Sequence, residues 1–313
     1  KAHGDYYRAD KGDLRIIVRQ DAPIKGKVAI ATGGGSGHLP VFMGYVGKGL
    51  ADGACIGNVF SSPSAGQMKR VTKAIDGGAG VLYLYGRYQG DMMNFNSAAE
   101  ESIKNGIRVE SVIVSDDVAS APPERHSERR GVAGIFFAYK IAGAMANEMA
   151  SLDEVKRVTQ KAVDNTRSLG IALGPCTIPL VGKPNFEISD DEMEIGMGIH
   201  GEQGVERVKM RTADEIAATL VDRVVNDMPF VAGDEVAVLV NSLGATPLEE
   251  LYVLYRKIDE LLREKGLVLH RPYVGRYACS MEMQGMSLSL MKLDDELKRL
   301  LDAPADSPFF KQF

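Results

Sequence analysis

Two of the five histidines stand in glycine-rich segments, where little steric cover surrounds the imidazole. His38 ends the run Thr-Gly-Gly-Gly-Ser-Gly-His that begins at residue 32, and His200 lies in Gly-Met-Gly-Ile-His-Gly-Glu, residues 196–202. Asp91 follows Gly-Arg-Tyr-Gln-Gly at the end of an apolar stretch. Imidazoles and a carboxylate around glycine-lined space are suited to proton transfer, and an imidazole nitrogen can also act as a nucleophile. His38, Asp91 and His200 are therefore the candidate catalytic residues.

Each of these features also has a structural interpretation, which the residues alone leave open. The glycine run leaves backbone N–H groups uncovered for a ligand oxygen, but it is equally typical of a tight strand-to-helix turn. Asp91 suits a helix N-cap as well as a base. For His200 the catalytic and the structural interpretations have equal weight. The other three histidines lie in polar surroundings or at a strand end, and we expect solvated or structural roles for His3, His126 and His270.

Other kinds of site fit these residues less well. His38 stands where a dinucleotide-binding GxGxxG motif needs its third glycine, and no Walker-type phosphate loop is present. Ser36 lies close to His38, as a Ser-His-Asp hydrolase would need, but the surrounding residues do not form a GxSxG elbow. No two histidines share i, i+4 spacing, and the three cysteines are far apart, so we expect neither a metal site nor a disulfide framework. This use of cysteine favours the reducing cytoplasm.

The overall charge argues against two classes of partner. The chain has 37 Lys and Arg against 42 Asp and Glu, a formal net charge of −5, and no stretch concentrates the basic residues. We therefore expect no binding to nucleic acid. No apolar run approaches the ~18 to 20 residues that a membrane-spanning helix requires, so we expect no membrane insertion.

The elements that must position the candidate residues follow from the alternation of apolar runs and amphipathic stretches. Short apolar runs that end in Gly or Asp predict strands at 27–31, 80–85, 108–114, 235–240 and 266–270, the first of them breaking at the glycines 33–35. Helical spacing predicts helices at 64–75, 93–105, 134–150, 152–168, 212–227 and 247–265. Strands interleaved with helices imply a sheet covered on both faces.

The fold class is therefore α/β, with two α/β domains that each contain a mostly parallel or mixed sheet flanked by helices. We expect the boundary near residue 165, because the Gly- and Pro-rich stretch 170–184 resembles a crossing between domains. Residues 1–165 would hold the GGGSGH and GDMMNF motifs, and residues 166–313 the GIHGE motif.

The three motifs, in this order, resemble the substrate-binding K subunit of dihydroxyacetone kinases. Further segments along the whole chain share the resemblance: GNVFSSPS at 57–64, RRGVAG at 129–134, LGPCTIP at 173–179, NSLGATP at 241–247 and SMEMQGM at 280–286. Together these motifs are specific, although GGGSG alone would be weak.

The resemblance implies a covalent binding mode for a short ketose. An imidazole adds to the ketone carbon and forms a hemiaminal, and His200 matches that position. His38 and Asp91 match the family's acid/base pair, with Asp91 the more direct base for the hydroxyl that accepts the phosphoryl group. The backbone of Gly35, Ser36 and Gly37 would hold the oxygens of the substrate.

The resemblance also implies that the substrate and the nucleotide bind to different domains or subunits. Phosphoryl transfer needs a nucleotide cradle or a carboxylate cluster that holds Mg²⁺, and this chain has neither in recognisable form. In the family the nucleotide sits in a separate L domain or subunit, so we expect no cofactor on this chain and expect Mg²⁺ with ADP or ATP on a partner L subunit. The chain stops at Phe313, which suits the split type served by a phosphotransferase-system protein or by ATP. The K subunit is expected to be a homodimer. A stand-alone nucleotide enzyme is the contrasting hypothesis.

Several positions depart from the family pattern. Leu39 replaces a Glu, Gly86 and Arg87 replace a Lys-Asn pair, Gln89 replaces a Thr, and Gln203 replaces a Pro. The lost Lys is a substrate contact in the family. These changes leave the identity of the ketose open, and a four-carbon ketose such as erythrulose would fit a modified pocket. They also admit a regulatory paralogue, a coactivator that captures the ketose without phosphorylating it.

Overall fold

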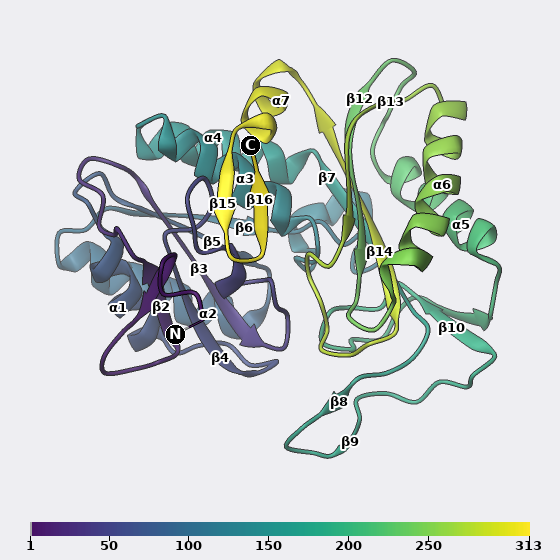
Figure 1. Cartoon of the computed structure of the whole chain (residues 1–313), viewed down its shortest axis with the longest axis horizontal. Helices are drawn as coiled ribbons and strands as arrows, with labels where there is room; N and C mark the ends of the chain where they lie inside the picture. Colours follow the sequence, from purple (N-terminus) through teal and green to yellow (C-terminus); the bar gives the residue numbers. More distant parts are fainter. Residues whose placement is uncertain (1) are drawn as a thin grey trace. The chain divides into compact units, whose positions relative to one another are not determined.

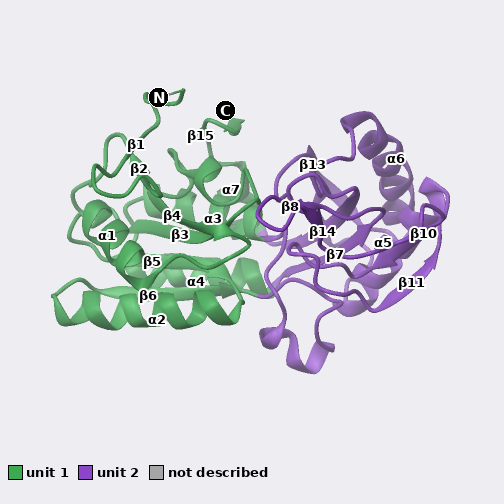
Figure 2. Cartoon of the chain, turned by 90° about the horizontal axis from the view of Figure 1, so that it is seen from below, with its two compact units in different colours: residues 1–114, 135–164, 295–313 green, residues 115–134, 165–294 purple. Residues whose placement is uncertain are grey.

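The computed structural model describes residues 2–313 and divides them into two compact units (Figure 2). Unit 1 consists of the residues up to Val114, Ile135–Asp164 and Asp295–Phe313, and unit 2 consists of Ser115–Gly134 and Asn165–Asp294. The sequence-based boundary near residue 165 falls at one of the points where the chain passes between units. The stretches 115–134 and 295–313, however, lie in the opposite unit from the one that this boundary assigned them.

Unit 1 is built on a six-stranded sheet in the order β1-β2-β4-β3-β5-β6 (Figure 1). Strands β4, β3, β5 and β6 are mutually parallel, and β1 and β2 pair antiparallel at the edge of the sheet. Helix α1 packs with α2 and α3 packs with α4, and each pair contacts the sheet. The elements are β1 Tyr7–Ala9, β2 Ile16–Arg19, β3 Ala29–Ser36, η1 Met43–Tyr45, β4 Gly53–Val59, α1 Ala65–Ile75, β5 Val81–Gly86, α2 Gln89–Lys104, β6 Val109–Val114, α3 Ile135–Asn147, α4 Leu152–Asp164, α7 Asp295–Asp302, β15 Ala305–Ser307 and β16 Phe310–Gln312.

Unit 2 contains a second six-stranded sheet, in the order β11-β10-β7-β14-β12-β13. Only the β12–β13 pair is parallel, and the other four pairs are antiparallel. Its core gathers apolar residues from the sheet and from α5 and α6. The elements are η2 Pro123–Glu128, β7 Thr166–Ala172, β8 Thr177–Ile178, β9 Lys183–Pro184, β10 Glu192–Ile195, β11 Glu206–Lys209, α5 Ala213–Asp227, β12 Glu235–Ser242, α6 Leu248–Glu264, β13 Val268–Gly275 and β14 Gly285–Leu293. The predicted fold class, two mixed sheets with flanking helices, is confirmed.

Two helix starts follow directly from local sequence. Ser64 accepts a hydrogen bond from the Gln67 amide at 3.2 Å, and the Gln67 side chain accepts one from the Ser64 amide at 2.9 Å. Thr212 and Glu215 form the same reciprocal cap at the start of α5. These capping boxes satisfy backbone N–H groups that a helix end otherwise leaves without partners.

Three local predictions were wrong. The glycines 33–35 do not end a strand but lie inside β3. Residues 166–168, predicted as the end of a helix, begin strand β7, in which all but one residue are buried. Helix α2 begins at Gln89 rather than at Met93. In each case packing against the rest of the unit outweighs the local pattern.

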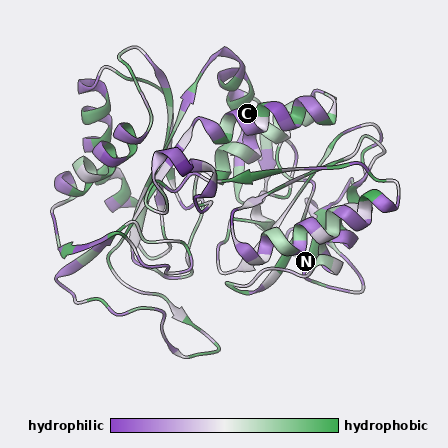
Figure 3. Cartoon of the chain, turned by 180° about the vertical axis from the view of Figure 1, so that it is seen from behind, coloured by the Kyte–Doolittle hydropathy of each residue, from purple (hydrophilic) through white to green (hydrophobic). Residues whose placement is uncertain are grey.

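The hydropathy of the chain follows this architecture (Figure 3). Helix α4 buries Leu152, Val155, Val158 and Ala162 on one side, whereas α3 is buried along most of its length. Within residues 2–313, no helix combines the length and the apolar character that crossing a bilayer requires.

Candidate functional site

The glycine run at the end of β3 is required by the packing of unit 1 itself. A Cβ atom added at Gly33, Gly34 or Gly35 would lie closer than 3.0 Å to Cys55, to the Phe42 ring or to the backbone around Ser61, respectively. All three glycines are buried, and only Ser36 and Gly37, the next two residues, are partly exposed. The glycines thus allow neighbouring segments to approach β3 closely, just before His38.

His38 is held in an aromatic environment. It is 1% exposed, and its ring stacks on Phe60 with centroids 5.0 Å apart and an interplanar angle of 17°. The edge of Phe42 meets the same ring at 6.3 Å and 89°. The Phe60 amide donates to the carbonyl of Ser36 at 3.0 Å, which ties Phe60 to the end of β3. Packing therefore fixes the plane of the His38 imidazole.

Asp91 lies in the first turn of α2 and is 6% exposed. The N-cap of this helix is Tyr88, so the N-cap interpretation of Asp91 was wrong. The positive end of the helix dipole favours an ionised carboxylate at this position. Burial, together with the negative charge of Asp91, raises the pKa of Tyr85 to about 12.

Strand topology brings the ends of two strands to one edge of the sheet. β3 and β5 are neighbouring parallel strands, His38 follows the first, and Asp91 lies soon after the second. Ligands of α/β sheets bind at the carboxyl ends of parallel strands. Both residues therefore follow the carboxyl ends of neighbouring strands of this sheet.

His200 lies in unit 2, in the loop between β10 and β11, and its side chain is 20% exposed. Glu202 forms several contacts with other residues of this loop. Its carboxylate lies 2.8 Å from His200 Nδ1 through Oε1 and accepts the His200 backbone N–H at 2.9 Å through Oε2. The Glu202 carbonyl accepts from the Gly198 amide at 3.0 Å, and Asn185 donates to the His200 carbonyl at 3.2 Å.

The carboxylate determines which imidazole nitrogen can react. Burial alone would raise the pKa of Glu202, but the hydrogen bond and the charge of His200 outweigh it and bring that pKa to about 2. An ionised carboxylate can only accept a hydrogen bond, so in the neutral imidazole Nδ1 carries the proton. The lone pair is then on Nε2, which is the ring atom that could act as a nucleophile.

Glu202 was not among the residues singled out from the sequence. Its spacing of two residues from His200, within His-Gly-Glu, was the available signal. The structure thus presents the candidate residues in two groups: His38 and Asp91 in unit 1, and His200 with Glu202 in unit 2.

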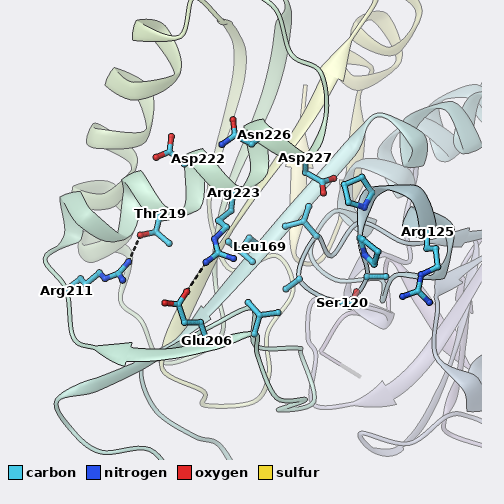
Figure 4. A pocket seen from close by; sticks show the side chains of 16 residues that line it. Ser120, Arg125, Leu169, Glu206, Arg211, Thr219, Asp222, Arg223, Asn226 and Asp227 are labelled. Carbon is cyan, nitrogen blue, oxygen red and sulfur yellow. Dashed lines mark hydrogen bonds and ion pairs between the residues drawn. The ribbon is translucent and has the colours of Figure 1, made fainter.

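A cavity of about 800 Å³ in unit 2 contains none of these residues (Figure 4). One wall comes from α5, where Thr219 receives a hydrogen bond of 2.9 Å from Arg211, and Arg223 pairs with Glu206 at 2.8 Å. Arg125 lies on the facing side. Asp227, which also lines the cavity, forms a buried ion pair with Arg129 at 2.6 Å.

Within residues 2–313, no three or more His, Cys, Asp or Glu side chains are grouped so as to hold a metal ion. All three cysteines are buried thiols. Burial raises the pKa of Cys279 to about 11, which makes this thiol a poor nucleophile.

The model of the Dak1 domain matches residues 1–309. The dihydroxyacetone-binding subunit of PTS-dependent dihydroxyacetone kinase 2 from Listeria innocua is 47% identical over 99% of this chain and 93% of its own length. D-erythrulose kinase from Mycolicibacterium smegmatis is 46% identical over 95% of this chain, which spans 51% of that enzyme. Among solved structures, the dihydroxyacetone kinase operon co-activator DhaQ superimposes with a TM-score of 0.93 at 30% identity, over 99% of this chain and 95% of that one. The resemblance inferred from the motifs is confirmed: the chain belongs to the Dak1 domain family.

Proposed function

We propose that this chain is the substrate-binding K subunit of a dihydroxyacetone kinase, a phosphotransferase with an alcohol group as acceptor, and that it binds a short ketose covalently on His200. The contact between His200 Nδ1 and Glu202, at 2.8 Å, carries the proposal, because it makes Nε2 the nucleophile. The 47% identity to a dihydroxyacetone-binding subunit supports the choice of substrate.

The proposed step adds the whole ketose to the protein. Nε2 forms a bond to the ketone carbon, the carbonyl π bond breaks, and its oxygen takes a proton from His38, the general acid of this step, to become a hydroxyl group. The imidazole becomes a cation, which the ionised Glu202 stabilises by charge. No atom leaves, so the protein gains the mass of one ketose.

We assign His38 and Asp91 to the acid/base work, His38 toward the new hydroxyl and Asp91 as the base for the accepting hydroxyl. Their positions after two neighbouring parallel strands support this role. The backbone of Gly35, Ser36 and Gly37 would bind substrate oxygens. Of these, Ser36 and Gly37 have the exposure that this requires.

The phosphoryl donor belongs to a partner in this proposal. A separate L subunit would carry Mg²⁺ with ADP or ATP, and a phosphotransferase-system protein or ATP itself would recharge it. The PTS-dependent relative supports the first route. We further propose that the K subunit is a homodimer and works in the cytoplasm.

Mass spectrometry of the intact protein with dihydroxyacetone tests the covalent step. The wild-type protein should gain the mass of one ketose, and His200→Ala should gain none. His126→Ala is the matched control, because His126 lies in η2, away from the His200 loop in sequence, and should keep the adduct. An adduct that survives in His200→Ala would refute the assignment of the nucleophile.

A phosphorylation assay with the L subunit tests the acid/base pair. His38→Ala and Asp91→Asn should each lower kcat by roughly 10²- to 10⁴-fold, which is the usual contribution of a positioned acid or base. Rates within threefold of wild type in both variants, with adduct formation intact, would remove these residues from the mechanism.

The co-activator and the erythrulose kinase each support an alternative. A TM-score of 0.93 to DhaQ favours a regulatory paralogue that binds the ketose without phosphorylating it, and such a protein would form the adduct but show no turnover with any L subunit. The 46% identity to D-erythrulose kinase favours a four-carbon ketose. Competition between dihydroxyacetone and erythrulose for the adduct, read as two mass increments, decides between the substrates.

A further inference from the structure

Arg130 and Asp117 form an ion pair in the segment Ser115–Gly134 of unit 2, with the carboxylate buried and the arginine partly exposed. The Asp117 side chain is 2% exposed, and its Oδ2 accepts from Arg130 Nε at 2.8 Å and lies 2.6 Å from Nη2. The backbone joins the same two residues, because the Asp117 amide donates to the Arg130 carbonyl at 3.1 Å. Ser120 Oγ accepts from the Arg130 amide at 3.0 Å. The guanidinium is therefore held in one orientation.

The same guanidinium reaches the loop that carries His200. Arg130 Nη2 donates to the carbonyl of Gly196 at 3.1 Å, at the first residue of that loop. A Cβ atom added at Gly198 would lie closer than 3.0 Å both to Arg130 Nη1 and to the Glu202 carboxylate. Arg130 and Glu202 thus approach the same point of the loop, and only a glycine at position 198 leaves room for both.

Stability alone does not account for this ion pair. Burial raises the pKa of Asp117 to about 6, although the charge of Arg130 opposes the rise. An ion pair with a buried carboxylate contributes little net stability, because the cost of removing that charge from water offsets much of the attraction. Burial of the Asp117 carboxylate costs free energy, and its partner Arg130 contacts the loop that carries His200. The ion pair therefore suits a positioning role better than a stabilising one.

We propose that Arg130, oriented by Asp117, is a positioning residue for His200: it fixes the loop of residues 196–202 so that Glu202 holds the imidazole with its proton on Nδ1. The part of this proposal that concerns reactivity rests on the proposed function, whereas the part that concerns the tautomer does not.

The consequence of losing Arg130 follows from the hydrogen bonds of the loop. Without the bond to Gly196 the loop relaxes, the Glu202 carboxylate moves relative to the ring, and the Nε2–H tautomer becomes populated. In that tautomer Nε2 has no lone pair with which to attack. Charged groups of unit 2 that contact the loop or its partners include Glu202, Arg130 and Asp117, which pairs with Arg130. They also include Glu194, which accepts from the Gly204 amide at 2.8 Å and pairs with Arg207.

The test compares Arg130→Gln and Arg130→Lys with Arg125→Gln, an exposed arginine of the same segment whose ion pair with Glu128 is 3.3 Å long. Long-range ¹H–¹⁵N NMR of protein with labelled histidine reads the His200 tautomer without ketose, and His200→Ala assigns the signal. Intact mass then gives the rate of adduct formation with dihydroxyacetone.

We expect Arg125→Gln to match the wild type. Arg130→Gln should show a mixture of tautomers and form the adduct about 10- to 100-fold more slowly, as for other losses of alignment. Arg130→Lys should give a tautomer mixture and an adduct rate between those of the wild type and Arg130→Gln, because lysine keeps the charge but lacks the forked set of donors.

A wild-type tautomer and adduct rate in either Arg130 variant would overturn the proposal. If Arg130→Gln does not unfold cooperatively, Arg130→Lys decides by the same two readouts. If the wild-type protein forms no adduct at all, the proposed function fails, and the tautomer measurement still decides on Arg130.

Discussion

At the scale of single residues, the Glu202 carboxylate has two neighbours that matter for the loop of His200. It lies 2.8 Å from His200 Nδ1, which directs the proton of the neutral ring to that nitrogen and leaves the lone pair on Nε2. A Cβ atom added at Gly198 would lie closer than 3.0 Å both to this carboxylate and to Arg130, so the two groups approach the same point of the loop.

The low pKa of Glu202 predicts a dependence of stability on pH. That pKa is about 2 in the folded protein against an ordinary value of 4.5, so ionised Glu202 stabilises the fold above pH 4.5, and this contribution is lost as the pH falls toward 2. Glu202→Gln should therefore lower the free energy of unfolding at pH 7 by no more than about 3 kcal/mol.

Urea unfolding of wild type and Glu202→Gln at pH 7, 4 and 3 measures this difference. It should shrink as the pH falls through this window. Glu206→Gln is the matched control, since Glu206 is a half-exposed carboxylate of the following strand and should show a small difference at all three values. A Glu202 difference that grows at low pH would contradict the assignment.

The sequence singled out His38, Asp91 and His200 as candidates because their residue types and glycine neighbours can be read directly from the chain. It did not identify Glu202 or Arg130 as positioning groups, since a carboxylate two residues from a histidine is common. The contact of Arg130 with Gly196 joins positions 66 residues apart. Only the folded chain brings such residues together.

At the scale of the elements, the glycines of β3 show why a strand can contain residues that normally end one. Glycine weakens a strand unless another segment needs the space, and here Cys55, Phe42 and the backbone near Ser61 occupy it. The sequence predicted the strand but placed its end too early, because the segments that need the space are themselves up to 26 residues away in the chain from the glycine they contact. Strand β14 was not predicted, although eight of its nine residues are buried.

This packing predicts opposite effects for two glycine substitutions. Gly34→Ala places a methyl group against the Phe42 ring, which also contacts His38, and should lower the free energy of unfolding by about 1 to 3 kcal/mol. Gly66→Ala is the control: Gly66 lies in helix α1, and the nearest atom to an added Cβ is 3.9 Å away. This change should be neutral or stabilising by up to about 1 kcal/mol.

Thermal and urea unfolding measure both variants. If Gly34→Ala is as stable as Gly66→Ala, the glycine run is not needed for packing, and a direct role in ligand binding becomes the better explanation of its presence.

At the scale of the whole molecule, unit 1 depends on its last segment. Helix α7 buries Leu297, Leu300 and Leu301. Lys140 of α3 donates to the Ala303 carbonyl, and the rings of Phe136 and Phe310 meet at 5.0 Å and 75°. The expected single boundary near residue 165 could not reveal this, since nothing in the composition of residues 295–313 shows which unit they join.

Deleting residues 295–313 should therefore destabilise unit 1 selectively. Three buried leucines contribute roughly 1.5 to 3 kcal/mol each, which approaches the whole stability of a typical domain. Hydrogen exchange should show lost protection in β3 and β5 and retained protection in β12 and β14. Deletion of Phe313 alone, which is 96% exposed, is the control and should change the protection of neither unit. Equal loss of protection in both units would contradict the assignment of this segment to unit 1.

The division of the chain also fixes the order in which the two units can be finished during synthesis. Every residue of unit 2 has been made once the ribosome has added Asp294, whereas unit 1 still lacks α7 and the β15–β16 hairpin. The unit that contains most of the early residues is thus the later one to be complete. Between these two moments the nascent chain has an unfinished apolar surface on α3, and that surface is where a chaperone would be expected to bind.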